Sequence, residues 1–206
     1  MTTMSITLLN MDCMEYMRSV PDKHFDLAIV DPPYGINVTK MNMGGRKTVK
    51  KDESKSWDSS VPNEQYFLEL FRTSKRQVIW GGNYFKLPCS QYFAIWDKGE
   101  AMYGRDFAEC EYAWVSSGGT RIFKTSPIDV YRIHPTQKPR KLYDWVLANY
   151  AKPGDKILDT HLGSGSSAIA AHYGGFEFVG TELDADYFKA AKERFNRETA
   201  QIAMQL

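Results

Sequence analysis

The chain has 206 residues, of which 43% are hydrophobic and 25% charged, and its formal net charge is +1. This composition predicts one globular α/β domain over residues 1–206. No apolar run approaches the ~18 residues that cross a bilayer, and no basic-then-apolar segment is typical of a signal peptide, so we expect a cytoplasmic protein with no membrane association. The cysteines form no CxxC pair and the histidines no HExxH pattern, so we expect neither a disulfide framework nor a metal site.

Apolar runs alternate with polar turns along the whole chain. In the first half we expect strands at 6–9, 25–30, 77–80, 92–96 and 111–115, a helix after Asp12 and a helix that opens at 62–64. In the second half we expect helices at 139–150, at 168–172 and near the end of the chain, with strands at 156–158 and 176–180. This alternation predicts a Rossmann-like, mainly parallel sheet with helices on both faces. The run 121–123 could pair as a hairpin, which would give one reversed strand at an edge.

The stretch Asp31-Pro32-Pro33-Tyr34 follows the strand expected at 25–30. Each proline fixes its own φ and pushes the preceding residue towards extended geometry, so this stretch should form a stiff corner at the carboxyl end of a strand. Ligands bind at that edge in open α/β sheets. There the tyrosine ring can stack on a planar base, and the carboxylate can accept a hydrogen bond from an exocyclic amine. The alternative is an ordinary turn with a solvated aspartate and a surface tyrosine.

Two segments are locally basic although the whole chain is nearly neutral. Lysine and arginine outnumber the acidic residues between 40 and 56 and again between 121 and 141, so either segment could contact a phosphate backbone. Residues 36–61 are polar, lack periodicity and directly follow the corner, which predicts a mobile basic loop over a ligand. Residues 99–133, which overlap the second basic segment, are a candidate insertion for recognising a nucleic-acid target. The alternative for each segment is a solvated loop.

The second half contains a nucleotide-binding pattern. Gly163-Ser164-Gly165 lies between a strand and a helix, and Glu182 ends the next strand, 19 residues after Gly163. Glycines let the backbone approach a ligand at a helix N-terminus, and an acid at this distance can bind a ribose diol. A purely structural interpretation, with glycines for tight packing and a surface Glu182, stays open. So does a dinucleotide oxidoreductase, because Ala168 completes its GxGxxG/A spacing, although that class leaves the Asp-Pro-Pro-Tyr corner unexplained.

The Asp-Pro-Pro-Tyr corner, followed much later by Asp159 and the Gly-Ser-Gly loop, resembles the S-adenosylmethionine-dependent DNA amino-methyltransferases of adenine N6 and cytosine N4. The catalytic motif precedes the cofactor motif, which is similar to their circularly permuted β-type order. The segments at 10–13 and 134–139 resemble further segments of this family, and 80–85 resembles small phage or prophage adenine methyltransferases. Two positions depart from the pattern: His161 stands where Phe is frequent, and Thr160 where Pro is frequent.

The resemblance implies a role for each motif residue. It implies a catalytic set of Asp31, Pro32, Pro33 and Tyr34, in which the Asp31 carboxylate and the Pro32 carbonyl accept the N–H groups of the target amine while Tyr34 stacks on the base. It implies a cofactor-binding set made of Asp12, Cys13, Asp31, Thr136, Gln137, Lys138, Asp159, His161, Gly163, Ser164, Gly165 and Glu182. In this set Glu182 would hold the ribose of S-adenosylmethionine, and Lys138 would pair with the cofactor carboxylate.

The aspartate at the head of the motif favours adenine, because related cytosine-N4 enzymes more often carry serine there. We therefore expect a DNA methyltransferase that acts on the N6 amine of adenine and takes the base out of the duplex stack. Family members often pair as homodimers, a point that the sequence leaves open. An N4-cytosine enzyme and an RNA or protein-amide methyltransferase also stay open. The same holds for a non-catalytic nucleic-acid-binding module, although the intact motifs argue against it.

Overall fold

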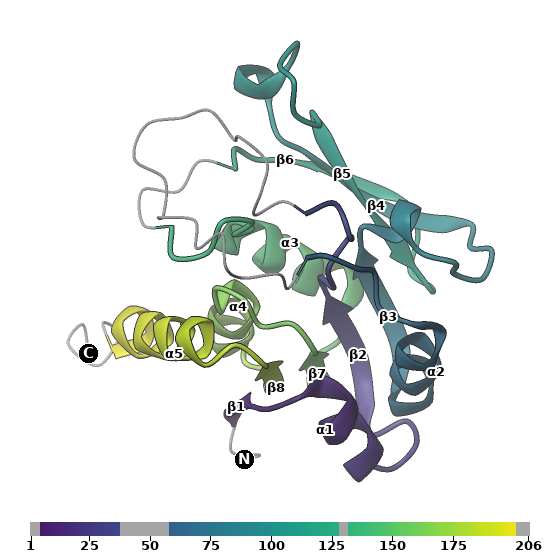
Figure 1. Cartoon of the computed structure of the whole chain (residues 1–206), viewed down its shortest axis with the longest axis vertical. Helices are drawn as coiled ribbons and strands as arrows, with labels where there is room; N and C mark the ends of the chain where they lie inside the picture. Colours follow the sequence, from purple (N-terminus) through teal and green to yellow (C-terminus); the bar gives the residue numbers. More distant parts are fainter. Residues whose placement is uncertain (1–4, 38–57, 128–131, 201–206) are drawn as a thin grey trace.

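The computed structural model describes residues 5–37, 58–127 and 132–200, and its centre is a sheet of eight strands in the order β1-β8-β7-β2-β3-β5-β4-β6 (Figure 1). The strands are β1 (Ile6–Asn10), β2 (Phe25–Val30), β3 (Ser74–Trp80), β4 (Tyr92–Asp97), β5 (Cys110–Val115), β6 (Arg121–Lys124), β7 (Lys156–Asp159) and β8 (Glu177–Glu182). All strand pairs except those of β5 are parallel. Within these ranges no helix is long and apolar enough to cross a membrane.

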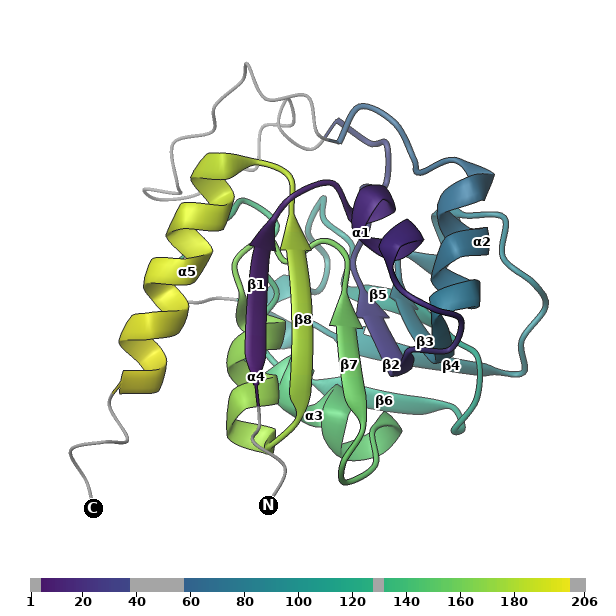
Figure 2. The same ribbon diagram turned by 90° about the horizontal axis from the view of Figure 1, so that it is seen from below.

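Helices cover both faces of the sheet (Figure 2). They are α1 (Cys13–Ser19), α2 (Glu64–Thr73), α3 (Arg140–Tyr150), α4 (Ser166–Gly174) and α5 (Ala185–Ala200), with short 3-10 turns η2 (Gly82–Tyr84) and η3 (Glu100–Met102). Helices α1 and α2 pack together on one face, where Met17 and Leu70 are buried in one apolar core. Helices α3, α4 and α5 share the other face and the second core, which includes Val146 and Ala191. The predicted Rossmann-like architecture is confirmed.

The single reversed strand among these eight is β5, which lies inside the sheet. It is antiparallel to both β3 and β4, whereas β6 pairs in parallel with β4, so that Ala94 lies opposite Arg121. The expectation that 121–123 closes an edge hairpin is therefore corrected. The hairpin forms earlier, between β4 and β5, and the chain then crosses to the outer side of β4. The exposed Arg121 and Lys124 suit an edge strand, because charged side chains discourage pairing with another sheet.

The sheet brings two distant parts of the sequence together at one edge. Strands β2 and β7 are parallel neighbours, with Leu27 opposite Ile157. From there the chain winds through α2 to β3 on one side and through α4 to β8 on the other. The carboxyl ends of β2 and β7 thus form a topological switch point, the usual ligand site of such sheets. The predicted mobile loop at 36–61 falls mainly on 38–57, which lies outside the described residues.

Candidate active site

The corner after β2 is fixed by an aspartate from the far end of the following segment. The buried Asp58 carboxylate accepts the backbone N–H groups of Tyr34, at 2.8 Å, and Gly35, at 2.9 Å. The Asn37 N–H donates to the Asp58 carbonyl at 3.0 Å. These contacts join both ends of the segment beside the corner and complement the stiffness of Pro32 and Pro33. Sequence analysis missed Asp58, since no periodicity links it to residues 23 or 24 positions away.

Tyr34 is held between Asp31 and a second aromatic ring. Its hydroxyl donates to Asp31 Oδ1 at 2.6 Å, and its ring stacks on that of Tyr84 with centroids 4.8 Å apart and planes at 12°. The ring also packs against Gly81, where an added Cβ would lie 2.2 Å from it, so only glycine fits. Burial raises the pKa of Tyr34 well above its usual value of 10.0, which keeps the hydroxyl a donor.

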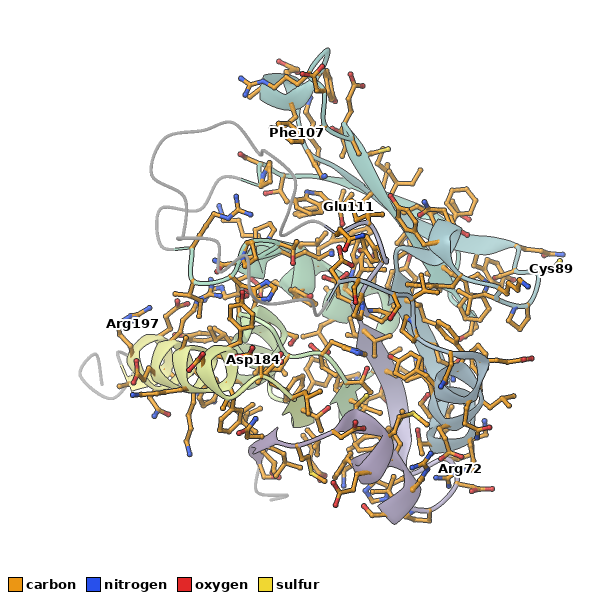
Figure 3. All side chains as sticks on the ribbon, viewed as in Figure 1. Arg72, Cys89, Phe107, Glu111, Asp184 and Arg197 are labelled. Carbon is orange, nitrogen blue, oxygen red and sulfur yellow. The ribbon has the colours of Figure 1, made fainter. Side chains whose placement is uncertain are left out.

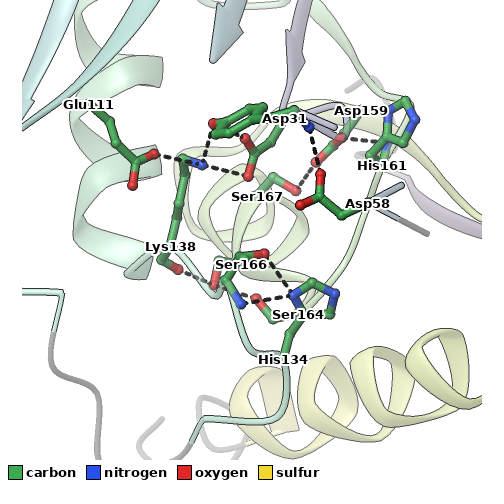
Figure 4. Close-up of polar contacts among 12 residues, drawn as sticks. Asp31, Asp58, Glu111, His134, Lys138, Asp159, His161, Ser164, Ser166 and Ser167 are labelled. Atoms are coloured by element: carbon green, nitrogen blue, oxygen red, sulfur yellow. Dashed lines mark hydrogen bonds and ion pairs between the residues drawn. The ribbon is translucent and has the colours of Figure 1, made fainter. Parts of the chain in front are cut away.

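Lys138 places a buried positive charge against the corner (Figure 4). Its Nζ lies 2.5 Å from Asp31 Oδ2, 3.2 Å from the Tyr34 hydroxyl and 3.1 Å from Glu111 Oε2, and the residue is only 5% exposed. Burial alone would lower the pKa of this ammonium, but the two carboxylates raise it above its ordinary value. For Asp31, burial raises the pKa against the opposing charge of Lys138. The motif that predicted Lys138 gave no sign of these partners.

The carboxylate that ends β7 is used differently. Asp159 accepts the His161 N–H at 3.0 Å and the Ser167 hydroxyl at 2.5 Å, so both donors belong to its own loop and the helix that follows. The side chain is 2% exposed, and burial raises its pKa to about 7. Burial lowers the pKa of the neighbouring His161 to about 4, so that imidazole is neutral at physiological pH.

The loop from β7 to α4 leaves an open cradle at Gly163. Glu182 accepts the Gly163 N–H at 2.9 Å through Oε2 and the Asp184 N–H at 3.0 Å through Oε1, which couples the ends of β7 and β8. An added Cβ at Gly163 would meet nothing closer than 3.8 Å, whereas one at Gly165 would touch Ala191 at 3.4 Å. Gly163 therefore leaves room for a ligand, while Gly165, at φ 75°, serves the turn and the close approach of α5.

A cavity of about 350 Å³ joins the two strand ends, a volume in the range of ligand sites. The predicted residues that line it are Cys13, Asp31, Pro33, Thr136, Gln137, Lys138, His161, Gly163, Ser164 and Glu182. The predicted residues outside its lining are Asp12, Pro32, Tyr34, Asp159 and Gly165. The Asp12 carboxylate instead caps α1, accepting the N–H groups of Met14 and Glu15. Within the described ranges no cluster of three or more His, Cys, Asp or Glu side chains could hold a metal ion.

The cavity also has lining residues that sequence analysis missed. These are His134, Tyr143, Thr160, Leu162, Ser166, Leu183, Asp184 and Tyr187. Leu183 is 70% exposed at the end of β8, and an apolar residue directly after a strand-terminal acid was an available signal. Burial raises the pKa of the Cys13 thiol to about 12, so this side chain lines the cavity as a neutral group. The cavity thus has apolar walls with carboxylates at both ends, which suits a ligand with a nucleoside part and a reactive centre near Asp31.

Comparison with known proteins agrees with this geometry. A family model described as DNA methylase (N6_N4_Mtase) matches residues 40–193. YubD of Escherichia coli K12, a protein with a provisional methylase designation, is 27% identical over 213 residues, covering 94% of this chain and 91% of that one.

Two solved structures are similar in fold. The complex of M1.HpyAVI with S-adenosylmethionine has a TM-score of 0.60 at 19% identity, covering 93% of this chain and 100% of that one. The cytosine-N4-specific PvuII DNA methyltransferase has a TM-score of 0.60 at 14% identity, covering 97% of this chain and 93% of that one. The Gly163 cradle and the Glu182 carboxylate fit S-adenosylmethionine, the cofactor that the resemblance implied. The chain belongs to the N6/N4 DNA methylase family and uses S-adenosylmethionine as its methyl donor.

Proposed function

We propose that this protein transfers a methyl group to the N6 amine of adenine in DNA, with Asp31 as the acceptor that faces the amine. The observation that carries this proposal is the course of the cavity, which runs from Asp31 to the Gly163 cradle and Glu182. One continuous space can therefore hold the methyl donor at one end and present its reactive centre to a carboxylate at the other.

Residues around the β7 and β8 ends would hold the cofactor, which supplies an electrophilic methyl group when bound. Glu182 is the proposed acceptor for the ribose hydroxyls of the cofactor. The backbone at Gly163 and Ser164 would approach the cofactor closely, and the Leu183 side chain would cover one of its apolar faces. Thr136 and Gln137 line the same cavity and are assigned to the polar tail of the cofactor. The expectation that Lys138 pairs with the cofactor carboxylate stays a prediction, and the contacts of its ammonium with Asp31 and Glu111 favour a different role.

The corner after β2 would make the target amine reactive. Its nitrogen lone pair is delocalised into the ring, so the amine is a weak nucleophile. If Asp31 accepts one N–H and the Pro32 carbonyl the other, the nitrogen becomes more pyramidal and its lone pair is available. The new N–C bond would form as the bond between the methyl group and the sulfonium sulfur breaks, leaving S-adenosylhomocysteine. The positive charge that develops on the nitrogen would be stabilised by the Asp31 carboxylate. The nitrogen then loses one proton, to Asp31 or to water.

The choice of adenine rests on the aspartate at the head of the motif, which the resemblance associates with adenine N6. The target base has to leave the duplex stack, at a cost of a few kcal/mol. Tyr34 is the proposed stacking partner of the base, and the nearly parallel ring of Tyr84 holds the Tyr34 ring in place. We assign DNA contacts to the basic loop at 36–61 and to the candidate target-recognition insertion at 99–133. In the insertion, Arg121 and Lys124 are exposed on the edge strand β6.

The test is methyl transfer from labelled S-adenosylmethionine to unmethylated DNA, with RNA assayed beside it and the digested nucleosides identified. We expect N6-methyladenine in DNA, and loss of this product in Asp31→Ala. N4-methylcytosine would overturn the assigned base and keep the corner chemistry. Label in RNA alone would overturn the assigned substrate.

A further inference from the structure

Four charged side chains form a continuous chain that ends at the catalytic corner. Lys98, directly after β4, lies 2.9 Å from Glu111 Oε1 on β5. The other Glu111 oxygen lies 3.1 Å from Lys138 Nζ, which lies 2.5 Å from Asp31 Oδ2. Figure 3 places Glu111 near the centre of the molecule, whereas Arg72 and Cys89 lie at its periphery. The two ends of the chain of charges therefore belong to the β4–β5 hairpin and to the proposed reaction centre.

Glu111 has no role in the cofactor cavity, since it is absent from the lining. The Glu111 side chain is only partly exposed, so its carboxylate loses part of its hydration, and the two close ammonium groups compensate for that loss. Burial would raise the pKa of Glu111, but the charges of Lys138 and Lys98 hold it below the usual value, so the group is an anion. Asp31 alone would already neutralise Lys138. Glu111 likewise has its own partner in Lys98, so its contact with Lys138 makes that ammonium one that two carboxylates share.

We propose that Glu111 is a positioning residue for methyl transfer: as a second counter-ion it lets Lys138 move away from Asp31, so that an Asp31 oxygen can turn to the substrate amine. This inference rests on the proposed function, because it takes the amine to face Asp31. Lys98 holds Glu111 through its other carboxylate oxygen, Oε1.

The hydrogen bonds of the corner explain why Lys138 needs a second counter-ion. Both Asp31 oxygens already accept a donor, Oδ1 from the Tyr34 hydroxyl and Oδ2 from Lys138. A neutral N–H competes poorly with an ammonium for the same oxygen, because only the ammonium adds the attraction between two opposite charges. With Glu111 only 3.1 Å away, Lys138 can shift between the carboxylates without losing a counter-ion. The rings of Tyr34 and Trp80, centred 5.5 and 5.6 Å from its Nζ, also favour the ammonium.

The sharing of Lys138 between Glu111 and Asp31 also affects the pKa of Asp31. The titratable groups around this carboxyl are Tyr34 of the corner, Lys138 before α3, Glu111 of β5, Tyr143 of α3, Tyr66 of α2 and Asp159 of β7. After burial and Lys138, the charge of Glu111 is the next influence, and it raises the pKa of Asp31. Neutralising Glu111 removes this effect and leaves Lys138 to Asp31 alone. Both changes lower the pKa of Asp31.

The experiment compares Glu111→Gln, which removes the charge at constant shape, with Glu111→Asp, which keeps it. Glu177→Gln is the matched control, because Glu177 also pairs with a lysine, Lys156 at 2.8 Å, but at the opposite end of the sheet. Three quantities are measured: kcat, the pH profile of kcat/KM, and the affinity for S-adenosylhomocysteine. A fourth readout needs no turnover: the pH titration of the Asp31 carboxyl carbon by ¹³C NMR, assigned by its loss in Asp31→Asn.

For Glu111→Gln we expect kcat to fall at least about 10-fold, since the acceptor for the amine stays engaged with Lys138. The acidic limb of kcat/KM and the Asp31 titration should both move to lower pH by about one unit. Affinity for S-adenosylhomocysteine should stay as in the parent protein. Glu111→Asp should keep the parent limb, and Glu177→Gln should match the parent throughout.

A loss of kcat with an unmoved acidic limb and an unmoved Asp31 titration would overturn the inference, because it would reduce Glu111 to a packing role. Parent-like kcat in Glu111→Gln would overturn it as well. The proposed function fails separately: if the parent protein transfers no methyl group while the Asp31 titration still moves in Glu111→Gln, the charge coupling stands and the assigned reaction does not.

Discussion

Strands β2 and β7 are neighbours, and each leads directly to an aspartate at the same edge of the sheet, but the two carboxylates have different surroundings. Asp31 binds Tyr34 and Lys138, the latter from a segment 107 positions away, and it lines the cavity. Asp159 binds donors of its own loop and of the start of α4, at most 8 positions away, and is outside the lining. A carboxylate that only nearby residues satisfy organises its own turn, whereas one that binds a side chain from a distant segment can exchange that donor for a ligand. Position at the strand end alone does not distinguish the two.

Glu182→Gln, at the end of the neighbouring strand β8, should have the largest effect on cofactor affinity. The carboxylate orders Gly163 and Asp184 and is the proposed ribose acceptor, and an amide would turn an N–H group towards one of these donors. We expect affinity for S-adenosylhomocysteine, measured by calorimetry, to fall about 10- to 100-fold. At saturating cofactor, kcat should change little. Glu193→Gln, on the exposed surface of α5, is the control, and equal affinities in the two variants would contradict the assignment.

Asp159→Asn tests the raised pKa of Asp159 through the pH dependence of protein stability. Burial raises the pKa of the folded-state carboxyl from 3.8 to about 7, so the folded protein binds more protons than the unfolded chain between these values. The stability of the parent protein should therefore fall as pH rises from about 4 to about 7. The Asn variant lacks this loss, and urea unfolding at pH 5 and pH 8 should show a parent-minus-variant difference that decreases with pH. A pH-independent difference would refute the buried, protonated carboxyl.

His161→Phe should change the pH dependence of stability in the opposite direction. Burial lowers the pKa of His161 from 6.5 to about 4, so the unfolded chain binds the extra proton in this window and the parent protein loses stability as pH falls through it. At pH 5 the loss is about 2 kcal/mol. The phenyl ring keeps the edge contact with Tyr66, which the imidazole makes at 5.4 Å. Urea unfolding of the parent protein and the variant at pH 5 and pH 7.5 measures this loss of stability. Parallel pH profiles of the two proteins would contradict the lowered pKa of His161.

The smallest effect expected is that of Tyr84→Leu. Tyr84 is 44% exposed and stacks on Tyr34, so its loss removes a ring contact worth about 0.5–1.5 kcal/mol. We expect KM for DNA to rise a few-fold at nearly constant affinity for S-adenosylhomocysteine. Tyr92→Leu, an exposed tyrosine at the start of β4, is the matched control. A lower KM would mean that Tyr84 blocks the base instead of supporting its stacking partner.

Much of the fold could be predicted because its signals are local. The strand Phe25–Val30 agrees with its apolar run, and the glycines at 163 and 165 mark the turn into α4. The path of β6 was not predicted: its four residues carry no sign of which neighbour they pair with, and crossing to the outer side of β4 is decided by the whole sheet.

The candidate site shows the same division. Asp31, Gly163 and Glu182 could be identified because each stands at the end of a predicted strand or in the loop that follows it. The contact of Asp58 with the corner, and the chain of charges through Glu111, could not. Each depends on side chains that meet only after long segments have folded, and an isolated acid in a polar or alternating stretch is indistinguishable from a solvated one.

The most direct test of the account measures two quantities on one preparation of Asp31→Asn: the single-turnover rate of methyl transfer to DNA and the affinity for S-adenosylhomocysteine. If the end of β2 acts on the base while the ends of β7 and β8 hold the cofactor, the rate falls at least about 100-fold and the affinity stays within a few-fold of the parent value. A loss of affinity as large as the loss of rate would assign Asp31 to the cofactor and contradict the proposed division of labour.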